Sequence, residues 1–256
     1  MLLIFMEIFM KFKYVLLVVL LVILSLNNFV YAKKQKLVVG SNFAFAPLNF
    51  YNEKREKVGY DIDVINAIAK VINYDVQFES IPWDGLLPAL ISKKIDIVVS
   101  SMSITAERQK KVNFSDPYYT SSTLIVVNKN NKDIKDFSDL ENKTIGVNIG
   151  TTQAKYVEEN LKNPKIVYSN NPEELTLHLV SGKVDAILQD KPILEWFIKN
   201  DKTKSAKIVG TPIMDNDNYG IAIRKGDKEL LNKINSALKT IKENGVLDSI
   251  YKKWFK

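Results

Sequence analysis

Hydrophobic residues in the first half of the chain follow two alternating patterns. Short apolar runs rich in β-branched residues are typical of buried strands, whereas apolar residues spaced three or four apart are typical of amphipathic helices. Strands are therefore predicted at 37–40, 75–80 and 95–100, and helices at 60–72 and 85–92. We expect Asp61 to be the N-cap of the longer helix, with Ile62, Ile65 and Ile72 on its buried face. The order strand, helix, strand, helix, strand predicts a mostly parallel sheet with helices on both faces.

The same pattern begins again in the second half of the chain. It predicts strands at 123–127, 144–148, 165–169, 184–190 and 219–225, and helices at 152–161, 172–182 and 231–245. Gly182 is the expected end of the middle helix. No repeat, proline-rich linker or low-complexity stretch interrupts the sequence.

The N-terminal segment has the order of a secretory signal peptide. Basic residues at Lys11 and Lys13 precede the apolar run 14–26, and small residues at Val30 and Ala32 follow it. This order predicts a signal peptide at 1–32 that is cut after Ala32, whether translation begins at Met1 or at Met10. A retained membrane anchor is the alternative, although the apolar run is short of the ~20 residues that a spanning helix needs. The rest of the chain suits one large domain or two of ~100 residues each.

Composition excludes several classes of function. Cysteine is absent, which excludes disulfides, thiol catalysis and lipid anchoring at a signal cleavage site. A secreted protein without an anchor is most useful to a bacterium with two membranes, so we expect a periplasmic protein. The net charge is +7, but Lys alternates with Glu and Asp along the predicted helices, which indicates a solvated surface rather than a nucleic-acid-binding face. With His178 as the only histidine, we expect no metal site and no cofactor.

Polar and aromatic side chains follow the predicted strands, at the edge where open α/β sheets bind small ligands. These segments are SNFAFAPL, IPWDG and SSMSITAER in the first half, and NIGTTQ and QDKP in the second. They offer hydroxyls, one arginine, one aspartate and two aromatic rings, a set complementary to a free α-amino acid. The third segment has a second interpretation, because Thr105 is also a plausible N-cap for a short helix.

Each end of an α-amino acid has a candidate partner. Arg108 would hold the carboxylate through two parallel hydrogen bonds, and backbone N–H groups at the helix start near Thr152 would add donors. Asp190 would receive the ammonium group, helped by Ser101 and Ser103. Asp190 has an alternative interpretation as a helix cap ahead of Pro192.

Two aromatic residues are candidates for holding the ligand's side chain. Phe45 and Trp83 could lie on either side of it, through apolar contact or cation–π attraction. The alternative is that both rings belong to the hydrophobic core.

These segments, in this order, resemble the periplasmic binding proteins of polar amino acid ABC transporters, including the glutamine-binding and lysine/arginine/ornithine-binding proteins. The segments VGYDID, VDAILQDKP, YGIAIRK and ENGVLDSIYKKWF extend the resemblance over the whole mature chain. It implies an α/β fold of two Rossmann-like lobes joined by two hinge strands, the type II binding-protein fold. Lobe 1 would comprise 33–119 and 217–256, lobe 2 would comprise 122–214, and the hinges would lie near 120–121 and 215–216.

The resemblance also implies a role for the protein and a set of ligand contacts. Its implied contacts are Asn42, Phe45, Trp83, Ser100, Ser101, Ser103, Arg108, Thr152, Gln153 and Asp190. We expect a monomeric, non-enzymatic protein that delivers a free polar amino acid to a membrane-embedded ABC permease. SSMSIT, GTTQ and LQD are closer to members that bind basic amino acids, but Asn42 stands where those members often carry an acid. A neutral ligand such as glutamine is therefore the alternative.

Two other classes of function are rivals. A small-molecule dehydratase on the same scaffold would need a general acid or base in the cleft, for which Asp190 is the candidate. A sensory or cell-wall-remodelling module would use the same fold without transport.

Overall fold

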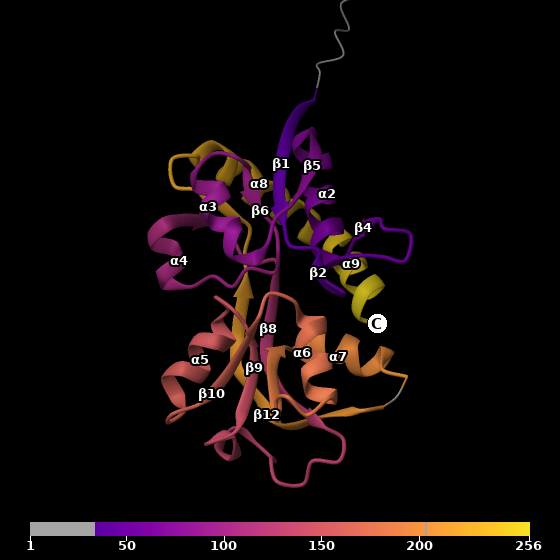
Figure 1. Cartoon of the computed structure of the whole chain (residues 1–256). Coiled ribbons are helices and arrows are strands. Elements are labelled where there is room, and N and C mark those ends of the chain that lie inside the picture. The colour runs from indigo at the N-terminus through magenta and orange to yellow at the C-terminus, as the bar shows by residue number, and fades with distance from the viewer. Residues whose placement is uncertain (1–33, 203) are drawn as a thin grey trace, which may run out of the picture. The chain divides into compact units, whose positions relative to one another are not determined.

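A computed structural model describes residues 34–202 and 204–256. The predicted signal peptide and its cut after Ala32 lie outside these residues. Within the described residues, two five-stranded sheets and one three-stranded sheet form (Figure 1). None of the described helices combines the length and the apolar character that crossing a membrane requires.

The first sheet has the strand order β5-β1-β6-β13-β7. Strand β1 (Gln35–Ser41) pairs in parallel with β5 (Tyr74–Ser80) and β6 (Ile97–Val98). Strand β13 (Ala222–Arg224) runs antiparallel to β6 and to the edge strand β7 (Val112–Phe114). The predicted parallel arrangement is thus confirmed for the strands that the first helices connect.

The second sheet repeats this plan in the order β10-β9-β11-β8-β12. Strands β10 (Lys165–Ser169), β9 (Thr144–Asn148) and β11 (Ala186–Asp190) are parallel. Strand β8 (Tyr119–Asn128) is antiparallel to β11, and the long β12 (Ala206–Tyr219) is antiparallel to β8.

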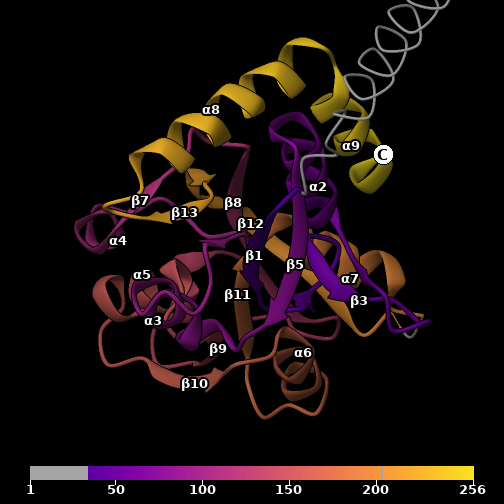
Figure 2. The same cartoon turned by 90° about the horizontal axis from the view of Figure 1, so that it is seen from above.

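Helices cover both faces of the first sheet. Successive side chains of a strand point to opposite faces, and β1 has apolar side chains on both of them. Val39 of β1 packs in the core beneath α2 (Tyr60–Ile72) and α8 (Lys228–Glu243). Val38, one residue earlier, packs in a separate core with α3 (Leu86–Ile91). Figure 2 shows α2, α8 and the C-terminal helix α9 (Val246–Phe255) side by side.

The second sheet is covered in the same way. Ile125 and Val127 of β8 pack in the core with α5 (Thr152–Asn160). Leu124 and Val126 point to the opposite face, where α6 (Pro172–Val180) and α7 (Lys191–Asn200) cover them. The shorter elements are β2 (Ala44–Phe45), β3 (Asn49–Tyr51), β4 (Lys57–Val58), the 3-10 helices η1 (Trp83–Gly85) and η2 (Phe137–Leu140), and α4 (Ala106–Lys111).

Strands β8 and β12 connect the two sheets. Tyr119 at the start of β8 pairs with Tyr219 at the end of β12, and Tyr219 also forms a bridge with Ser103 next to the first sheet. Both chain crossings therefore lie side by side, which is the two-lobe, two-connection architecture of the type II fold. The lobe boundaries given above remain a prediction.

The helix predicted at 60–72 is confirmed, but the prediction that Asp61 caps it is wrong. Gly59 is the N-cap, with a φ of 138° in a region that L side chains rarely adopt. A Cβ at Gly59 would lie 2.1 Å from the carbonyl oxygen of Leu48, so glycine alone fits this turn. Asp61 lies inside the helix and is completely buried.

The strand predicted at 95–100 is shorter in the structure, where β6 spans only Ile97–Val98. Side chains replace the ladder at its two ends. Asp96 Oδ2 accepts a hydrogen bond of 2.9 Å from the backbone N–H of Val38, and Ser100 Oγ accepts one of 3.1 Å from the backbone N–H of Asn42. Polar side chains at strand ends can take over backbone hydrogen bonds in this way.

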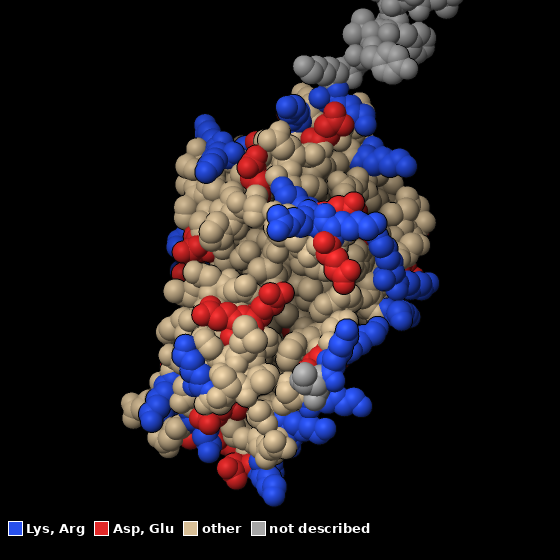
Figure 3. Space-filling model, turned by 45° about the vertical axis from the view of Figure 1, so that its right-hand side comes forward, with Lys and Arg blue, Asp and Glu red and all other residues tan. Residues whose placement is uncertain are grey.

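Charged side chains are mixed over the surface. On the face shown in Figure 3, Lys and Arg lie among Asp and Glu. Several pairs lie four residues apart on one helix, among them Lys233 with Glu229 at 2.7 Å and Lys191 with Glu195 at 3.4 Å. This distribution agrees with the solvated surface that the sequence predicts.

Candidate ligand-binding site

One cavity brings together all the predicted site residues except Asn42. It has an empty volume of about 280 Å³, part of which is open to solvent. Its lining consists of Phe45, Trp83, Ser100, Ser101, Ser103, Arg108, Thr151, Thr152, Gln153 and Asp190. Asn42 lies beside the cavity, where its backbone N–H donates to Ser100 Oγ, but its side chain is not part of the lining.

Both sheets contribute to this cavity. Phe45 comes from β2 in the three-stranded sheet. The first five-stranded sheet and its connecting segments supply Trp83 in η1, the serines that follow β6, and Arg108 in α4. The second supplies the start of α5 and, at the end of β11, Asp190. Arg108 and Asp190, the two groups expected at opposite ends of one ligand, thus line a single cavity.

Arg108 is held in place from both sheets. Thr105 is the N-cap of α4 and accepts a hydrogen bond of 3.2 Å from the backbone N–H of Arg108, so the capping interpretation of this segment is confirmed. The Arg108 side chain nevertheless reaches the cavity, where Nη1 donates to the Ser103 carbonyl oxygen at 2.9 Å and Nη2 donates to the Gly150 carbonyl oxygen at 3.1 Å. Burial lowers the pKa of the guanidinium, an effect that nearby Asp217 and Asp190 oppose.

The carbonyl oxygen of Gly150 accepts hydrogen bonds from two residues in segments that connect strands of the first sheet. Besides the bond from Arg108, it accepts one of 3.2 Å from Nε1 of Trp83. Gly150 has a φ of 70°, in the left-handed region that favours glycine. Its conformation turns the carbonyl toward the first sheet just before α5 begins.

Ser101 has its hydroxyl orientation fixed by a buried network. Its Oγ donates a hydrogen bond of 2.8 Å to Asp61 Oδ2 and accepts one of 3.1 Å from Asn49 Nδ2. Asp61 also accepts bonds from Asn49 Nδ2 at 2.7 Å and from the Tyr118 hydroxyl at 2.9 Å. Because the Ser101 proton is used inward, the oxygen can only accept hydrogen bonds from the cavity.

Asp61 is a functional candidate that sequence reasoning missed. Burial raises the pKa of its carboxyl to about 6, although hydrogen bonds from Ser101, Tyr118 and Asn49 act to lower it. The spacing of apolar residues on its helix indicates a capping or surface position. Only the burial of the helix start against β3 shows its actual role.

Asp190 lines the cavity, and its carboxylate is not used to cap a helix. It occupies the N-cap position of α7, but its side chain makes no capping hydrogen bond, so the capping interpretation fails for the carboxylate. Gln153 Nε2 donates a hydrogen bond of 3.1 Å to Asp190 Oδ1. Burial, with a contribution from Asp217, raises the pKa of Asp190 to about 7, while Gln153 and Arg108 oppose the shift.

Phe45 and Trp83 form one wall of the cavity rather than two opposing walls. Their ring centroids are 6.0 Å apart with an angle of 52° between planes, so the rings contact each other directly. Phe45 is 5% exposed and belongs to the core of the first sheet, as the alternative interpretation expects, and it also lines the cavity. The Arg108 guanidinium lies 5.3 Å from the Trp83 ring centroid, within cation–π range.

Asp217 is a second carboxylate beside the cavity, and sequence reasoning did not identify it. It lies in β12, and its Oδ2 accepts a hydrogen bond of 2.9 Å from Ser103 Oγ. The segment MDNDNY offers three acidic or amide neighbours without apolar periodicity, so no sequence signal separates Asp217 from Asp215. Thr151, which caps α5 and also lines the cavity, was missed next to Thr152.

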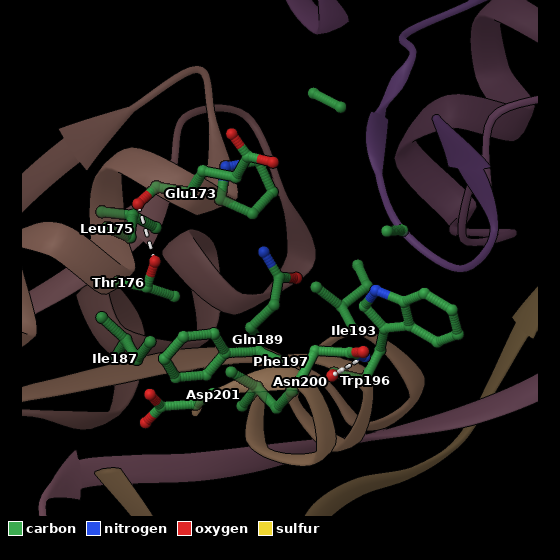
Figure 4. A pocket seen from close by; sticks show the side chains of 14 residues that line it. Glu173, Leu175, Thr176, Ile187, Gln189, Ile193, Trp196, Phe197, Asn200 and Asp201 are labelled. Atoms are coloured by element: carbon green, nitrogen blue, oxygen red, sulfur yellow. Dashed lines mark hydrogen bonds between the residues drawn. The ribbon is translucent and has the colours of Figure 1, made fainter. Parts of the chain in front are cut away.

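A larger and mostly apolar pocket lies elsewhere, between α6 and α7 (Figure 4). Its empty volume is about 760 Å³, and its lining includes Ile187, Ile193 and Phe197, with Gln189 pointing into it. No predicted site residue lines this pocket, and no arginine faces it. It offers nothing to hold the carboxylate of an amino acid, so the smaller cavity is the better candidate despite its size.

The site also differs from a metal centre. In the described part of the chain, no group of three His, Asp or Glu side chains is placed to hold a metal ion. The cavity instead combines a guanidinium, fixed hydroxyls and carboxylates, which is the chemistry of zwitterion recognition.

Comparison with known proteins finds relatives that are named for the amino acids they bind. A probable histidine-binding protein of Neisseria gonorrhoeae is 36% identical over 220 residues, 85% of this chain and 82% of that protein. The ABC transporter arginine-binding protein 1 of Escherichia coli (strain K12) is 33% identical over 239 residues, which cover 93% and 98% of the two chains.

Solved structures give the same result. An ancestral arginine-binding protein bound to glutamine superposes with a TM-score of 0.83 at 42% identity, covering 87% of this chain and 98% of that one. The sequence pattern of one family matches residues 37–256, almost the entire described chain. The chain therefore belongs to the bacterial extracellular solute-binding proteins, family 3.

Proposed function

We propose that this protein captures a free polar L-amino acid, preferentially a basic one, and delivers it to an ABC permease. The observation that carries the proposal is the shared cavity of Arg108 and Asp190. A guanidinium and a carboxylate in one small cavity match the two charged ends of an α-amino acid.

The ligand's carboxylate would lie at Arg108 and the start of α5. The guanidinium has five N–H donors, and the bonds to Ser103 and Gly150 leave others for the ligand. Thr152 and the first backbone N–H groups of α5 are further donors, at the helix end where the dipole favours an anion.

The ligand's ammonium would lie at the opposite end of the cavity. Asp190 is a buried carboxylate, and the side chains that donate to it, Gln153 and Tyr219, are neutral, so an ammonium would add a positive charge in direct contact. The Ser101 oxygen, which is restricted to accepting from the cavity, is a second acceptor.

A basic side chain is favoured over a neutral one for two reasons. Similar proteins are named for histidine and arginine. In addition, the amide of Asn42, which argued against a basic ligand, does not line the cavity. Glutamine is the alternative ligand, since an ancestral arginine-binding protein was solved with glutamine bound.

Capture would involve movement of the two sheets about β8 and β12. The predicted hinges near 120–121 and 215–216 fall on these two strands, and lobe 1 (33–119, 217–256) and lobe 2 (122–214) would close over the ligand. Because neither lobe alone supplies both Arg108 and Asp190, a ligand would bind the closed arrangement more tightly and so favour it.

The proposed location is the periplasm, after removal of the signal peptide at Ala32. Similarity to a protein named as part of an ABC transporter supports a membrane-embedded permease as the partner. The protein would act there as a monomer and without a cofactor.

A dehydratase is the second candidate, and one observation favours it. Asp190, with a pKa raised to about 7 beside Asp217, has the protonation behaviour of a general acid. We nevertheless propose binding without turnover, because the similar proteins are named as binding proteins. Incubation with each bound ligand, followed by NMR for new products, separates the two functions.

A thermal-shift screen of the twenty common amino acids tests the proposal. A ligand that binds only the folded state adds about 2.7 kcal/mol of stability at a hundredfold excess over its Kd. We expect arginine, lysine or histidine to raise the Tm most, and calorimetry on those ligands to give a one-to-one complex. If no amino acid raises the Tm, the proposed function is wrong.

A further inference from the structure

Asp217 is placed to influence the cavity without forming part of its lining. It lies on β12 opposite Ser121 of β8, close to the predicted hinge. Ser103 donates to its carboxylate at 2.9 Å, and the Thr152 side chain faces it from the second sheet. Its carboxylate is thus hydrogen-bonded by one residue that lines the cavity, Ser103, and lies near a second, Thr152.

Asp217 also interacts electrostatically with both charged residues of the site. It favours the charged form of Arg108 more strongly than Asp190 does, and it acts on Asp190 as a like charge. The cavity wall in the described chain therefore has one cation, Arg108, near two carboxylates, with Asp61 as a third behind Ser101. When these carboxylates are ionised, their negative charges outnumber the single positive charge of Arg108.

We infer that Asp217 is a specificity-determining residue that makes this cavity select amino acids of net positive charge over neutral zwitterions. This inference rests on the proposed function. A zwitterion adds no net charge and leaves the excess negative charge in place. A ligand with a cationic side chain cancels it, and the difference is large where the dielectric constant is low.

Asp217 would act through its field and not as a ligand contact. The Ser103 proton is committed to Asp217, which leaves the Ser103 oxygen as an acceptor toward the cavity. The carboxylate also fixes a negative charge next to the Arg108 guanidinium, which weakens the hold on the carboxylate that all amino acids share. Preference among ligands would then depend on side-chain charge, at some loss of affinity for neutral amino acids.

The test compares Asp217→Asn with Asp215→Asn. Asparagine keeps the size of the side chain and an acceptor for Ser103, and it removes only the charge. Asp215 lies on the same strand, is exposed, and gives the same change in net charge, so its variant is the matched control. Calorimetry with arginine and with glutamine, at one pH and low salt, gives the ratio of the two Kd values for each protein.

We expect Asp217→Asn to reduce the preference for arginine over glutamine by about tenfold, with glutamine binding unchanged or tighter. Asp215→Asn should keep the wild-type ratio. An unchanged ratio in Asp217→Asn, or an equal loss for both ligands, would overturn this inference and leave the proposed function intact. If the wild-type protein binds no amino acid, both are overturned.

A second variant provides the test if the first variant does not fold. Asp217→Ser removes the same charge and can still accept a bond from Ser103. If Asp217→Asn does not fold, the preference measured for Asp217→Ser decides the inference by the same criterion.

Discussion

The guanidinium of Arg108 donates a hydrogen bond of 3.1 Å to the backbone carbonyl oxygen of Gly150, which joins loops of the two sheets. Trp83 donates to the same oxygen, and Glu107 forms an ion pair of 3.3 Å with Lys155 nearby. These bonds lie at the rim of the candidate site. A ligand that enters between the sheets would have to break them, while the N–H groups of Arg108 that these bonds leave unused stay available to the ligand's carboxylate.

Replacement of Arg108 tests the carboxylate end of the proposed site. We expect Arg108→Ala to weaken binding of every amino acid ligand at least about tenfold, because a buried carboxylate without its partner costs ~2–5 kcal/mol. Calorimetry with arginine and glutamine measures the loss. Lys110→Ala, on the exposed side of the same helix, is the control for the change in net charge and should bind normally. Unchanged affinity in Arg108→Ala would reject the role of this residue as a clamp.

Acid should weaken binding because of Asp190. Its pKa of about 7 means that much of the carboxylate is protonated near neutral pH before a ligand arrives. An ammonium ligand favours the ionised form, so binding releases a proton, and the Kd for arginine should rise as pH falls below about 7 by up to about tenfold per unit. Around pH 8, where Asp190 is ionised and the ligand's amino group is still protonated, the affinity should no longer change with pH.

Calorimetry in two buffers of different ionisation enthalpy, at pH 6.5, measures the released proton directly. Several other groups also face Asp190, namely Asp217, Arg108, Gln153 and Tyr219. A variant is therefore needed to assign the released proton to Asp190. Asp190→Asn should bind arginine more weakly and lose the pH dependence. A Kd that stays constant between pH 5.5 and 8 in the wild type would contradict the prediction.

The buried Asp61 should matter for stability. Asp61→Ala leaves the donors of Asn49, Ser101 and Tyr118 without their acceptor, and each unpaired buried donor costs ~1–3 kcal/mol. We expect the free energy of unfolding to fall by about 3 kcal/mol or more at pH 7, measured by urea denaturation. Asp84→Ala, at an exposed position, should change it by less than about 0.5 kcal/mol.

The pH dependence of the free energy of unfolding is a second test of the contribution of Asp61 to stability. Its pKa is raised in the folded protein to about 6 from an ordinary value of 3.8, so the folded state binds the proton more tightly than the unfolded state. Its contribution to stability is therefore greatest below pH 4 and is lost as pH rises through about 6. Asp61→Asn should flatten the stability curve in this range, whereas an unchanged slope would show that other groups are responsible.

Local pattern was sufficient to predict much of the fold. The helix at 60–72 and the strand at 144–148 have the bounds that the sequence predicts, because the spacing of apolar residues reports which face of an element is buried. The polar segments after the strands meet in one cavity, since parallel strands end at the same edge of a sheet.

Contacts between distant parts of the chain decided the rest. The 14-residue strand β12 depends on pairing with β8, and its C-terminal segment MDNDNY carries no apolar alternation. Asp61 and Asp217 look like surface residues in the sequence. Asp61 becomes buried, and Asp217 partly buried, only when Ser101 and Ser103 are brought against them from another segment. The contact of Phe45 with Trp83 likewise follows from how two loops pack.

Local sequence pattern predicts the order of most elements, the edge of the sheets where the polar segments gather, and most of the side chains that line the cavity there. The tertiary structure alone decided how those side chains are oriented and how many carboxylates surround the single guanidinium. The physical reason is that periodicity records burial along one element, whereas the charge and hydrogen bonding of a site depend on groups that folding brings together.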